Sequence, residues 1–192
     1  MNPPFQATEL AHDWVRGRLR DGDVAIDATA GNGHDTLFLA QLVGQTGRVY
    51  AFDVQTEALE ATRALLEEHG LLDRVTLIQA SHEELESRVP CPPDSVRVIL
   101  FNLGYLPGGE KTVITRATTT LAALDASLRL LAPGGLLTIV GYSAHKGGEE
   151  ETEAVVEYCK ALNPAEFRSI RCQVLNFERI PPYTIAIEKR SA

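Results

Sequence analysis

The sequence lacks most of the features that place a protein in a special environment. None of its apolar runs approaches the roughly 20 residues that a membrane-spanning helix needs. Residues 1–5 have neither the basic nor the apolar region of a signal peptide. Its three cysteines, Cys91, Cys159 and Cys172, are scattered without the spacing of a metal site. We therefore expect a cytoplasmic protein with reduced thiols, no bound metal and no association with a membrane.

An excess of positive charge is also missing. The 18 Lys and Arg residues against 26 Asp and Glu residues give a net charge of −8, which argues against broad, non-specific affinity for nucleic acid. A local basic face stays possible, and Arg116, Lys146 and Arg179 are candidates for phosphate contacts. The hydrophobic fraction of 44% is ordinary, and no repeat or low-complexity tract interrupts the chain. We expect residues 1–192 to form a single domain.

Apolar residues recur with the periods of strands and helices in alternation. The expected strands are 24–27, 48–52, 75–79, 96–101, 136–140, 167–176 and 183–189, and the expected helices are 7–19, 34–42, 56–69, 115–131 and 148–162. Turns are expected at 133–135 and at Pro181-Pro182. This alternation predicts a mostly parallel sheet with helices on both faces and an antiparallel C-terminal hairpin at one edge. Seven strands of this kind are typical of the Rossmann-like, class I methyltransferase fold.

The first strand runs into a glycine turn, the segment 27–35 (DATAGNGHD), and the second strand ends in Asp53. Glycine lets the backbone turn tightly and approach a ligand closely. The helix that follows points N–H groups at the same place, and an acid after the second strand can accept hydrogen bonds from ribose hydroxyls. The motif therefore predicts a nucleotide-like ligand.

The details of the motif favour one such ligand. A dinucleotide site has Gly or Ala where this chain has Thr36, and no Gly-Lys-Ser/Thr follows, which excludes a Walker loop. The carboxylate of Asp27 would repel a pyrophosphate but suits an ammonium group. S-adenosylmethionine carries an ammonium group and no phosphate, and its carboxylate could lie on the helix amides near residues 32–35. We favour it over NAD(P), and a glycine turn without any ligand is the remaining alternative.

Ligands of open α/β sheets bind beyond the carboxyl ends of the strands, so residues after the other strands are candidates as well. After the third strand, Ser81 and His82 could flank an adenine. Alternatively, Ser81 and Glu84 could form a helix capping box. The residues expected to hold the cofactor are Asp27, Thr29, Gly31, Asn32, Gly33, Asp35, Asp53, Gln55, Ser81, His82 and Asn102.

The loop after the fourth strand begins with Asn102 and has Tyr105 three residues later. This is the outline of the Asn-Pro-Pro-Tyr loop of amino-directed methyltransferases, with Leu-Gly in place of Pro-Pro. An amide oxygen can accept a hydrogen bond from an amine, and an aromatic ring can pack on a flat base. A glycine-rich surface loop is the alternative. His145 follows the fifth strand, where it could bind substrate or accept a proton. The acidic run 149–151 favours a helix start over a metal site.

Four segments together resemble one family. They are 27–36 (DATAGNGHDT), 52–55 (FDVQ), 102–109 (NLGYLPGG) and 147–151 (GGEEE). The resemblance is to the family known as the "putative rRNA methylases", whose members are assigned as tRNA 5-aminomethyl-2-thiouridine methyltransferases. It covers nearly the whole chain, and His145 followed by Lys-Gly-Gly fits the family's His-x-Gly-Gly loop. It implies S-adenosylmethionine as methyl donor and the wobble uridine in the anticodon arm of certain tRNAs as acceptor, whereas the older label points to rRNA.

The sequence thus predicts methyl transfer from S-adenosylmethionine to an aminomethyl nitrogen of tRNA. Asn102, Tyr105 and His145 are the candidate catalytic residues, and a homodimer is expected because one subunit offers a small footprint for an anticodon arm. The alternatives are an rRNA methyltransferase, a small-molecule N-methyltransferase, an NAD(P)-binding oxidoreductase and a non-catalytic binding module.

Overall fold

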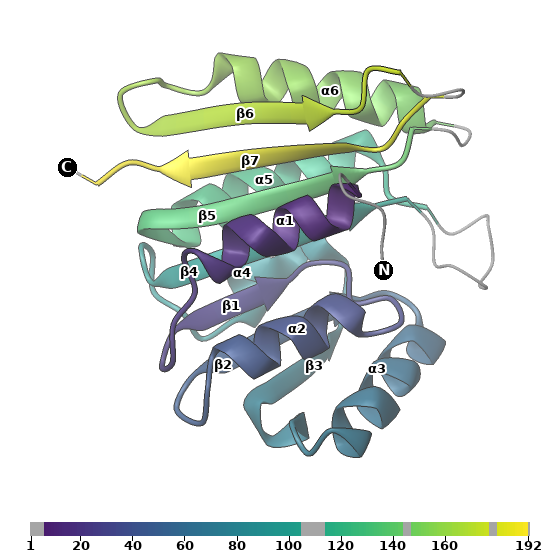
Figure 1. Ribbon diagram of the computed structural model, residues 1–192, viewed down its shortest axis with the longest axis vertical. Helices are drawn as coiled ribbons and strands as arrows, with labels where there is room; N and C mark the ends of the chain where they lie inside the picture. Colours follow the sequence, from purple (N-terminus) through teal and green to yellow (C-terminus); the bar gives the residue numbers. More distant parts are fainter. Residues whose placement is uncertain (1–5, 105–113, 144–146, 177–179, 192) are drawn as a thin grey trace.

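The computed structural model describes residues 6–104, 114–143, 147–176 and 180–191, and its centre is a seven-stranded sheet (Figure 1). The strands are β1 (Val24–Asp27), β2 (Arg48–Asp53), β3 (Val75–Gln79), β4 (Val96–Leu103), β5 (Leu131–Gly141), β6 (Phe167–Gln173) and β7 (Tyr183–Lys189). The helices are α1 (Ala7–Arg16), α2 (His34–Leu42), α3 (Thr56–Glu68), α4 (Leu85–Arg88), α5 (Ala117–Leu130) and α6 (Gly148–Ala161), with short 3₁₀ turns η1 (Leu72–Arg74) and η2 (His82–Glu84).

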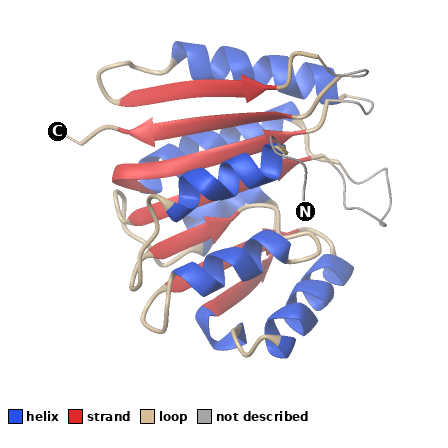
Figure 2. Ribbon diagram, in the orientation of Figure 1, coloured by secondary structure: helices blue, strands red, loops and turns tan. Residues whose placement is uncertain are grey.

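The strand order is β3-β2-β1-β4-β5-β7-β6, and helices cover both faces of the sheet (Figure 2). Strands β1 to β5 pair in parallel. Strand β7 lies antiparallel between β5 and β6, so that β6 forms the edge. The predicted fold class, including the antiparallel C-terminal hairpin, is confirmed.

Two apolar clusters hold the layers together, one on each face of the sheet. On one face, Val15 of α1, Leu39 of α2 and Leu66 of α3 pack on inward-facing strand residues. On the other face, Leu85 of α4, Leu124 of α5 and Val155 of α6 do the same. Burial of apolar surface on both faces accounts for the near-continuous hydrophobic runs of the central parallel strands.

Several expected boundaries differ from the structure. Helix α1 ends at Arg16 rather than at residue 19, and β6 ends at Gln173 rather than at 176. Strand β4 extends to Leu103, which places Asn102 inside the strand. The turn predicted at 133–135 lies within β5, because that strand already pairs with β4 at Leu131, with a register shift before pairing resumes at Leu136.

The connections reverse direction between β1 and β4, since β2 and β3 follow on one side of β1 and β5 lies on the other side of β4. Open α/β sheets bind ligands in the crevice that forms at the carboxyl end of such a switch point. Asp27 ends β1 and Asn102 is close to the end of β4, so both predicted motifs converge there. Within the part of the chain described, none of the helices has the length and apolar character to span a membrane.

Candidate functional site

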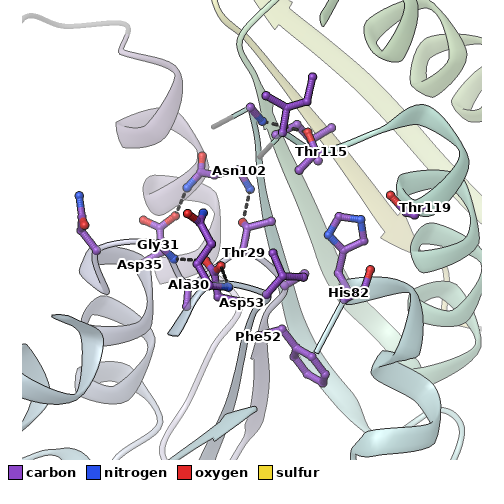
Figure 3. Close-up of a pocket in the computed structure, with 18 of the residues that line it drawn as sticks. Thr29, Ala30, Gly31, Asp35, Phe52, Asp53, His82, Asn102, Thr115 and Thr119 are labelled. Atoms are coloured by element: carbon purple, nitrogen blue, oxygen red, sulfur yellow. Dashed lines mark hydrogen bonds between the residues drawn. The ribbon is translucent and has the colours of Figure 1, made fainter. Parts of the chain in front are cut away.

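A cavity of about 870 Å³ opens at this switch point, within the range of small-molecule sites (Figure 3). Every residue predicted to hold the cofactor lines the cavity except Asp27 and Gly33. The residues brought together are Thr29, Gly31, Asn32, Asp35, Asp53, Gln55, Ser81, His82 and Asn102. A second wall comes from α1, the end of β5 and the start of α5. It contains Arg116, which the sequence singled out as a phosphate contact, and four residues that sequence reasoning did not find, namely Thr8, Tyr142, Thr115 and Thr119.

The glycine turn packs against α3. Gly31 and Gly33 have φ values of 53° and 83°, a region that L side chains rarely adopt. A Cβ atom on Gly33 would lie 2.8 Å from the Cα atom of Thr62, whose hydroxyl donates to the Gly31 carbonyl at 3.1 Å. Gly33 is therefore needed for close packing beneath the cavity, whereas Gly31 faces the cavity itself.

Asp53 joins the second strand to this turn. Its Oδ2 atom accepts a hydrogen bond from the N–H of Gly31 at 2.9 Å, and its Oδ1 atom accepts one from the N–H of Gln55 at 2.9 Å. A carboxylate has about four lone-pair sites, so Asp53 keeps acceptor capacity for hydroxyl groups of a ligand.

Asp27 differs from the expectation that it meets a ligand. Its side chain is fully buried, accepting hydrogen bonds from Oγ1 of Thr36 at 2.6 Å and from the N–H of Thr29 at 3.1 Å. Burial, followed by the negative charge of Asp35, raises the pKa of Asp27 to about 7. Thr36 thus has a partner that explains why Gly or Ala is absent at this position. Asp27 therefore stabilises the glycine turn and does not line the cavity.

Asp35 connects three elements at the rim of the cavity. Its Oδ1 atom lies 2.7 Å from Nε2 of His12 in α1, and its Oδ2 atom accepts a hydrogen bond from Nδ2 of Asn102 in β4 (Figure 3). The backbone N–H of Asn102 donates to Oγ1 of Thr29 at 2.7 Å. The buried Oδ1 atom of Asn102 has no hydrogen-bond partner among the described residues. His12 was missed because only the tertiary fold brings α1 beside the glycine turn.

His82 forms the side of the cavity that lies opposite Asp35 in the view of Figure 3. Its ring is 8% exposed and packs edge-on against Phe101, with ring centroids 5.8 Å apart. Burial lowers the pKa of His82 to about 4, which keeps the imidazole neutral near pH 7. The alternative capping box is wrong. Ser81 makes no side-chain cap, and Glu84 pairs with Arg88 instead.

Glu151 is buried, with 3% exposure, although it belongs to an acidic run. The run lies in the first turn of α6, as predicted. Glu151 additionally accepts hydrogen bonds from Thr115 at 2.7 Å and Thr120 at 2.6 Å. The N–H of Gly104 donates to Oγ1 of Thr115 at 3.0 Å. This buried carboxylate therefore fixes the end of β4 and the start of α5 where they line the cavity.

Four predicted residues, Tyr105, His145, Lys146 and Arg179, lie outside the described residues. Of the predicted phosphate contacts, Arg116 lines the cavity. Among the described residues, no group of His, Cys, Asp or Glu side chains is arranged to hold a metal ion.

The cavity fits S-adenosylmethionine better than a dinucleotide. Asp35 and Asp53 bring two carboxyl groups to its wall, which disfavours a pyrophosphate and suits an ammonium group and ribose hydroxyls. Helix α2 has Gly33 as its N-cap residue, without a capping side chain, so its first turn is suited to a ligand carboxylate. Apolar side chains line the rest, including Phe52, Val54 and Ala80, and provide a surface for a flat base.

Known proteins share this fold and sequence. The family model described as "Putative rRNA methylase" matches residues 49–188. The chain is 40% identical to the chloroplastic tRNA (mnm(5)s(2)U34)-methyltransferase of Arabidopsis thaliana, in an alignment covering 96% of this chain and 70% of that protein. The crystal structure of a "putative rRNA-methylase" from Clostridium thermocellum has a TM-score of 0.93 and 40% identity, covering 97% of this chain and 99% of that chain. A "putative methyltransferase" from Streptococcus mutans, solved in complex with SAH, has a TM-score of 0.87 and 40% identity, covering 96% and 98%.

The fold and the site define a class I methyltransferase that depends on S-adenosylmethionine. More particularly, the chain belongs to the family described as "Putative rRNA methylase". The predictions of family, fold, enzyme class and cofactor are therefore confirmed.

Proposed function

We propose that this chain is an RNA N-methyltransferase. It would convert 5-aminomethyl-2-thiouridine at the tRNA wobble position into 5-methylaminomethyl-2-thiouridine. The observation that carries the proposal is the amide of Asn102, whose unpartnered Oδ1 atom offers a hydrogen-bond acceptor beside the cavity. An amine that receives the methyl group carries N–H bonds, and one of them can donate a hydrogen bond to this oxygen. The name of the Arabidopsis relative supports the choice of nucleotide.

On the donor side, each residue has a role that follows from its contacts. Asp53 accepts hydrogen bonds from the ribose, and the turn at Gly31 and Asn32 with the start of α2 holds the amino-acid end. Gln55, Ser81 and His82 flank the adenine, with His82 neutral. Thr29 and Asp27 fix the turn from behind.

On the acceptor side, Asn102 orients the substrate amine. When bound, S-adenosylmethionine supplies an activated methyl group, so the acceptor nitrogen needs only a free electron pair and correct placement. Most of the rate enhancement should come from this placement and from exclusion of water. Tyr105 packs on the target base, and His145 accepts the released proton or contacts the RNA.

Binding of the anticodon arm would use basic side chains around the cavity mouth. Arg116 is exposed at the start of α5 and lines the cavity, and Lys146 and Arg179 are the further candidates for phosphate contacts. The enzyme would act in the cytoplasm as a homodimer, because one subunit has a small footprint for this RNA. Sedimentation at micromolar concentration tests the dimer, and a monomer alone would reject it.

The test of the function is methyl transfer from labelled S-adenosylmethionine to bulk tRNA lacking the modification, followed by nucleoside mass analysis. We expect label in a 5-methylaminomethyl-2-thiouridine nucleoside, and no incorporation into fully modified tRNA. Absence of label from tRNA, with cofactor binding intact, would refute the proposal.

The same assay on rRNA tests the second candidate, which the family description favours. Label in rRNA but not in tRNA would establish that alternative. Turnover of small amines without either RNA would indicate a small-molecule N-methyltransferase.

A further inference from the structure

Helix α1 contributes a histidine to the network behind Asn102. The ring of His12 stacks on Phe38, with centroids 3.8 Å apart and planes at 11°, and its Nε2 atom lies 2.7 Å from Oδ1 of Asp35. The Arg16 guanidinium lies 5.1 Å from the centroid of the Phe38 ring, on the same side of the helix. The side chains of His12 and Asp35 are only 13% and 8% exposed. His12 is therefore held in one orientation, with a nitrogen directed at Asp35.

Asp35 has two neighbours and one oxygen for each. With Oδ1 beside His12, Oδ2 accepts the hydrogen bond from Nδ2 of Asn102. A carboxylate cannot donate, so it accepts from the NH₂ end of the Asn102 amide and repels the oxygen end. The oxygen and the NH₂ group of an amide have nearly the same shape, so only a hydrogen-bonding partner such as this carboxylate fixes which way the amide points.

The consequence is that Oδ1 of Asn102 must point away from Asp35, as Figure 3 shows. This atom is buried and accepts no hydrogen bond within the described part of the chain. A buried acceptor without a partner is costly, and a ligand that brings an N–H group would remove that cost. The backbone of Asn102 is separately fixed by Thr29, so only the side-chain amide is free to invert.

We propose that His12 and Asp35 are positioning residues that lock the polarity of the Asn102 amide. The locked amide presents an acceptor atom to the methyl-receiving group and so selects amines that carry an N–H bond. This inference rests on the proposed function, because it concerns the amine that Asn102 orients.

Three variants separate this role from simple structural support. His12→Leu removes the contact to Asp35 but keeps an apolar side chain against Phe38. His12→Gln keeps an N–H donor at a similar reach and serves as the matched control. Asp35→Asn replaces the pure acceptor by an amide that can also donate to Oδ1 of Asn102, and thereby allows the inverted orientation.

The rate of methyl transfer should be measured in single turnovers, with the affinity for S-adenosylmethionine measured by calorimetry. We expect His12→Leu and Asp35→Asn to slow transfer about 10-fold to 100-fold, as misplaced reacting groups do. His12→Gln should restore most of the rate. Because Asp35 also lines the cavity, His12→Leu is the decisive variant, and its cofactor affinity should change far less than its rate.

A second readout does not depend on any RNA. The ¹⁵N-labelled side-chain amide of Asn102 should exchange its protons slowly with solvent in the wild-type protein, because one N–H is hydrogen-bonded to Asp35. His12→Leu and Asp35→Asn should accelerate that exchange, and His12→Gln should not. If no tRNA is methylated, the proposed function fails, and this measurement alone decides the positioning role.

Three results would overturn the inference. One is an unchanged rate and unchanged amide exchange in His12→Leu. Another is an equal loss in His12→Leu and His12→Gln, which would indicate that only the ring packing on Phe38 matters. The third is a loss of cofactor affinity as large as the loss of rate, which would assign His12 to cofactor binding.

Discussion

The carboxylate of Glu151 accepts a hydrogen bond from Oγ1 of Thr115 at 2.7 Å, and this contact ties the start of α6 to the wall of the cavity. Its second oxygen accepts one from Thr120 at 2.6 Å. Thr115 in turn exchanges hydrogen bonds of 3.0 Å with Gly104 at the end of β4. A single buried carboxylate therefore organises both segments that border the acceptor side.

We expect Glu151→Ala to lower the free energy of unfolding by about 1–3 kcal/mol, because two threonine hydroxyls lose their acceptor in a buried place. Chemical denaturation measures this loss. Glu150→Ala is the matched control, since Glu150 is exposed on the same turn, and it should change stability by less than about 0.5 kcal/mol. Equal effects of the two changes would contradict the role of Glu151.

The glycine turn offers a second matched pair. Gly33 and Gly70 both have positive φ, 83° and 65°, but only at Gly33 would a Cβ atom meet a neighbour, at 2.8 Å from Cα of Thr62. Gly70→Ala should cost about 1 kcal/mol from backbone strain alone. Gly33→Ala should cost about 1–3 kcal/mol more through overpacking. The free energies of unfolding from denaturant titrations test the difference. Similar losses of stability in the two variants would show that α3 shifts to make room for the added methyl group.

Asp27 makes stability depend on pH in an unusual direction. Its folded pKa is raised from 3.8 to about 7 by burial and by Asp35, so the folded state binds the proton more tightly than the unfolded state. The resulting stabilisation is complete below about pH 4 and is lost as the pH rises to about 7. Relative to Asp27→Asn, which cannot titrate, the wild type should lose up to about 1.4 kcal/mol per pH unit within that window. Denaturation of both proteins at about pH 5 and about pH 8 measures it, and a constant difference would refute it.

Much of the fold was predictable because burial leaves a periodic record in the sequence. The run 96–101, apolar except for Arg97, and the helical spacing in 56–69 reflect the environments found for β4 and α3. The sequence predicts a turn at 133–135, and the chain does bulge there, with a φ of 72° at Gly134 and five residues of β5 facing two of β4. Local turn residues do not reveal that β5 already pairs with β4 at Leu131, before the bulge. The pairing of β5 with β4 on both sides of residues 133–135 therefore determines the structure of that segment.

Site residues were predictable from the sequence where they belong to a local motif at the end of a strand. Asp53 and Gly31, predicted to hold the same ligand, both line the cavity, and the structure adds a hydrogen bond between them. For Glu151 the sequence predicts only a helix-start charge, because its threonine partners lie more than 30 residues away in sequence. The same limit hid His12, whose contact with Asp35 exists only after α1 packs on the sheet.

Asn102→Ala should reduce methyl transfer by about 100-fold or more, because the amine loses the group that orients it. Affinity for S-adenosylmethionine should fall much less. Asn163→Ala is the control, as this exposed asparagine hydrogen-bonds only within its own turn after α6. Single-turnover rates and calorimetric affinities decide the matter, and an equal loss of both would remove Asn102 from the acceptor side.

Arg116 provides the test of RNA contact within the described residues. Its side chain is exposed at the mouth of the cavity. Its backbone carbonyl accepts hydrogen bonds from Oγ1 of Thr119 and the N–H of Thr120, and a side-chain change leaves these bonds in place. If Arg116 binds a phosphate, Arg116→Ala should weaken tRNA binding and reduce the slope of log affinity against log salt by about 1.

Arg88→Ala is the matched control for this measurement. Arg88 is equally cationic but lies on α4, away from the cavity lining, in an exposed ion pair with Glu84. Both variants remove one positive charge from a chain whose net charge is −8, so a general electrostatic effect would move both slopes together. A change confined to Arg116→Ala would locate a phosphate contact at the cavity mouth, whereas an unchanged slope would place the RNA on another surface of the protein.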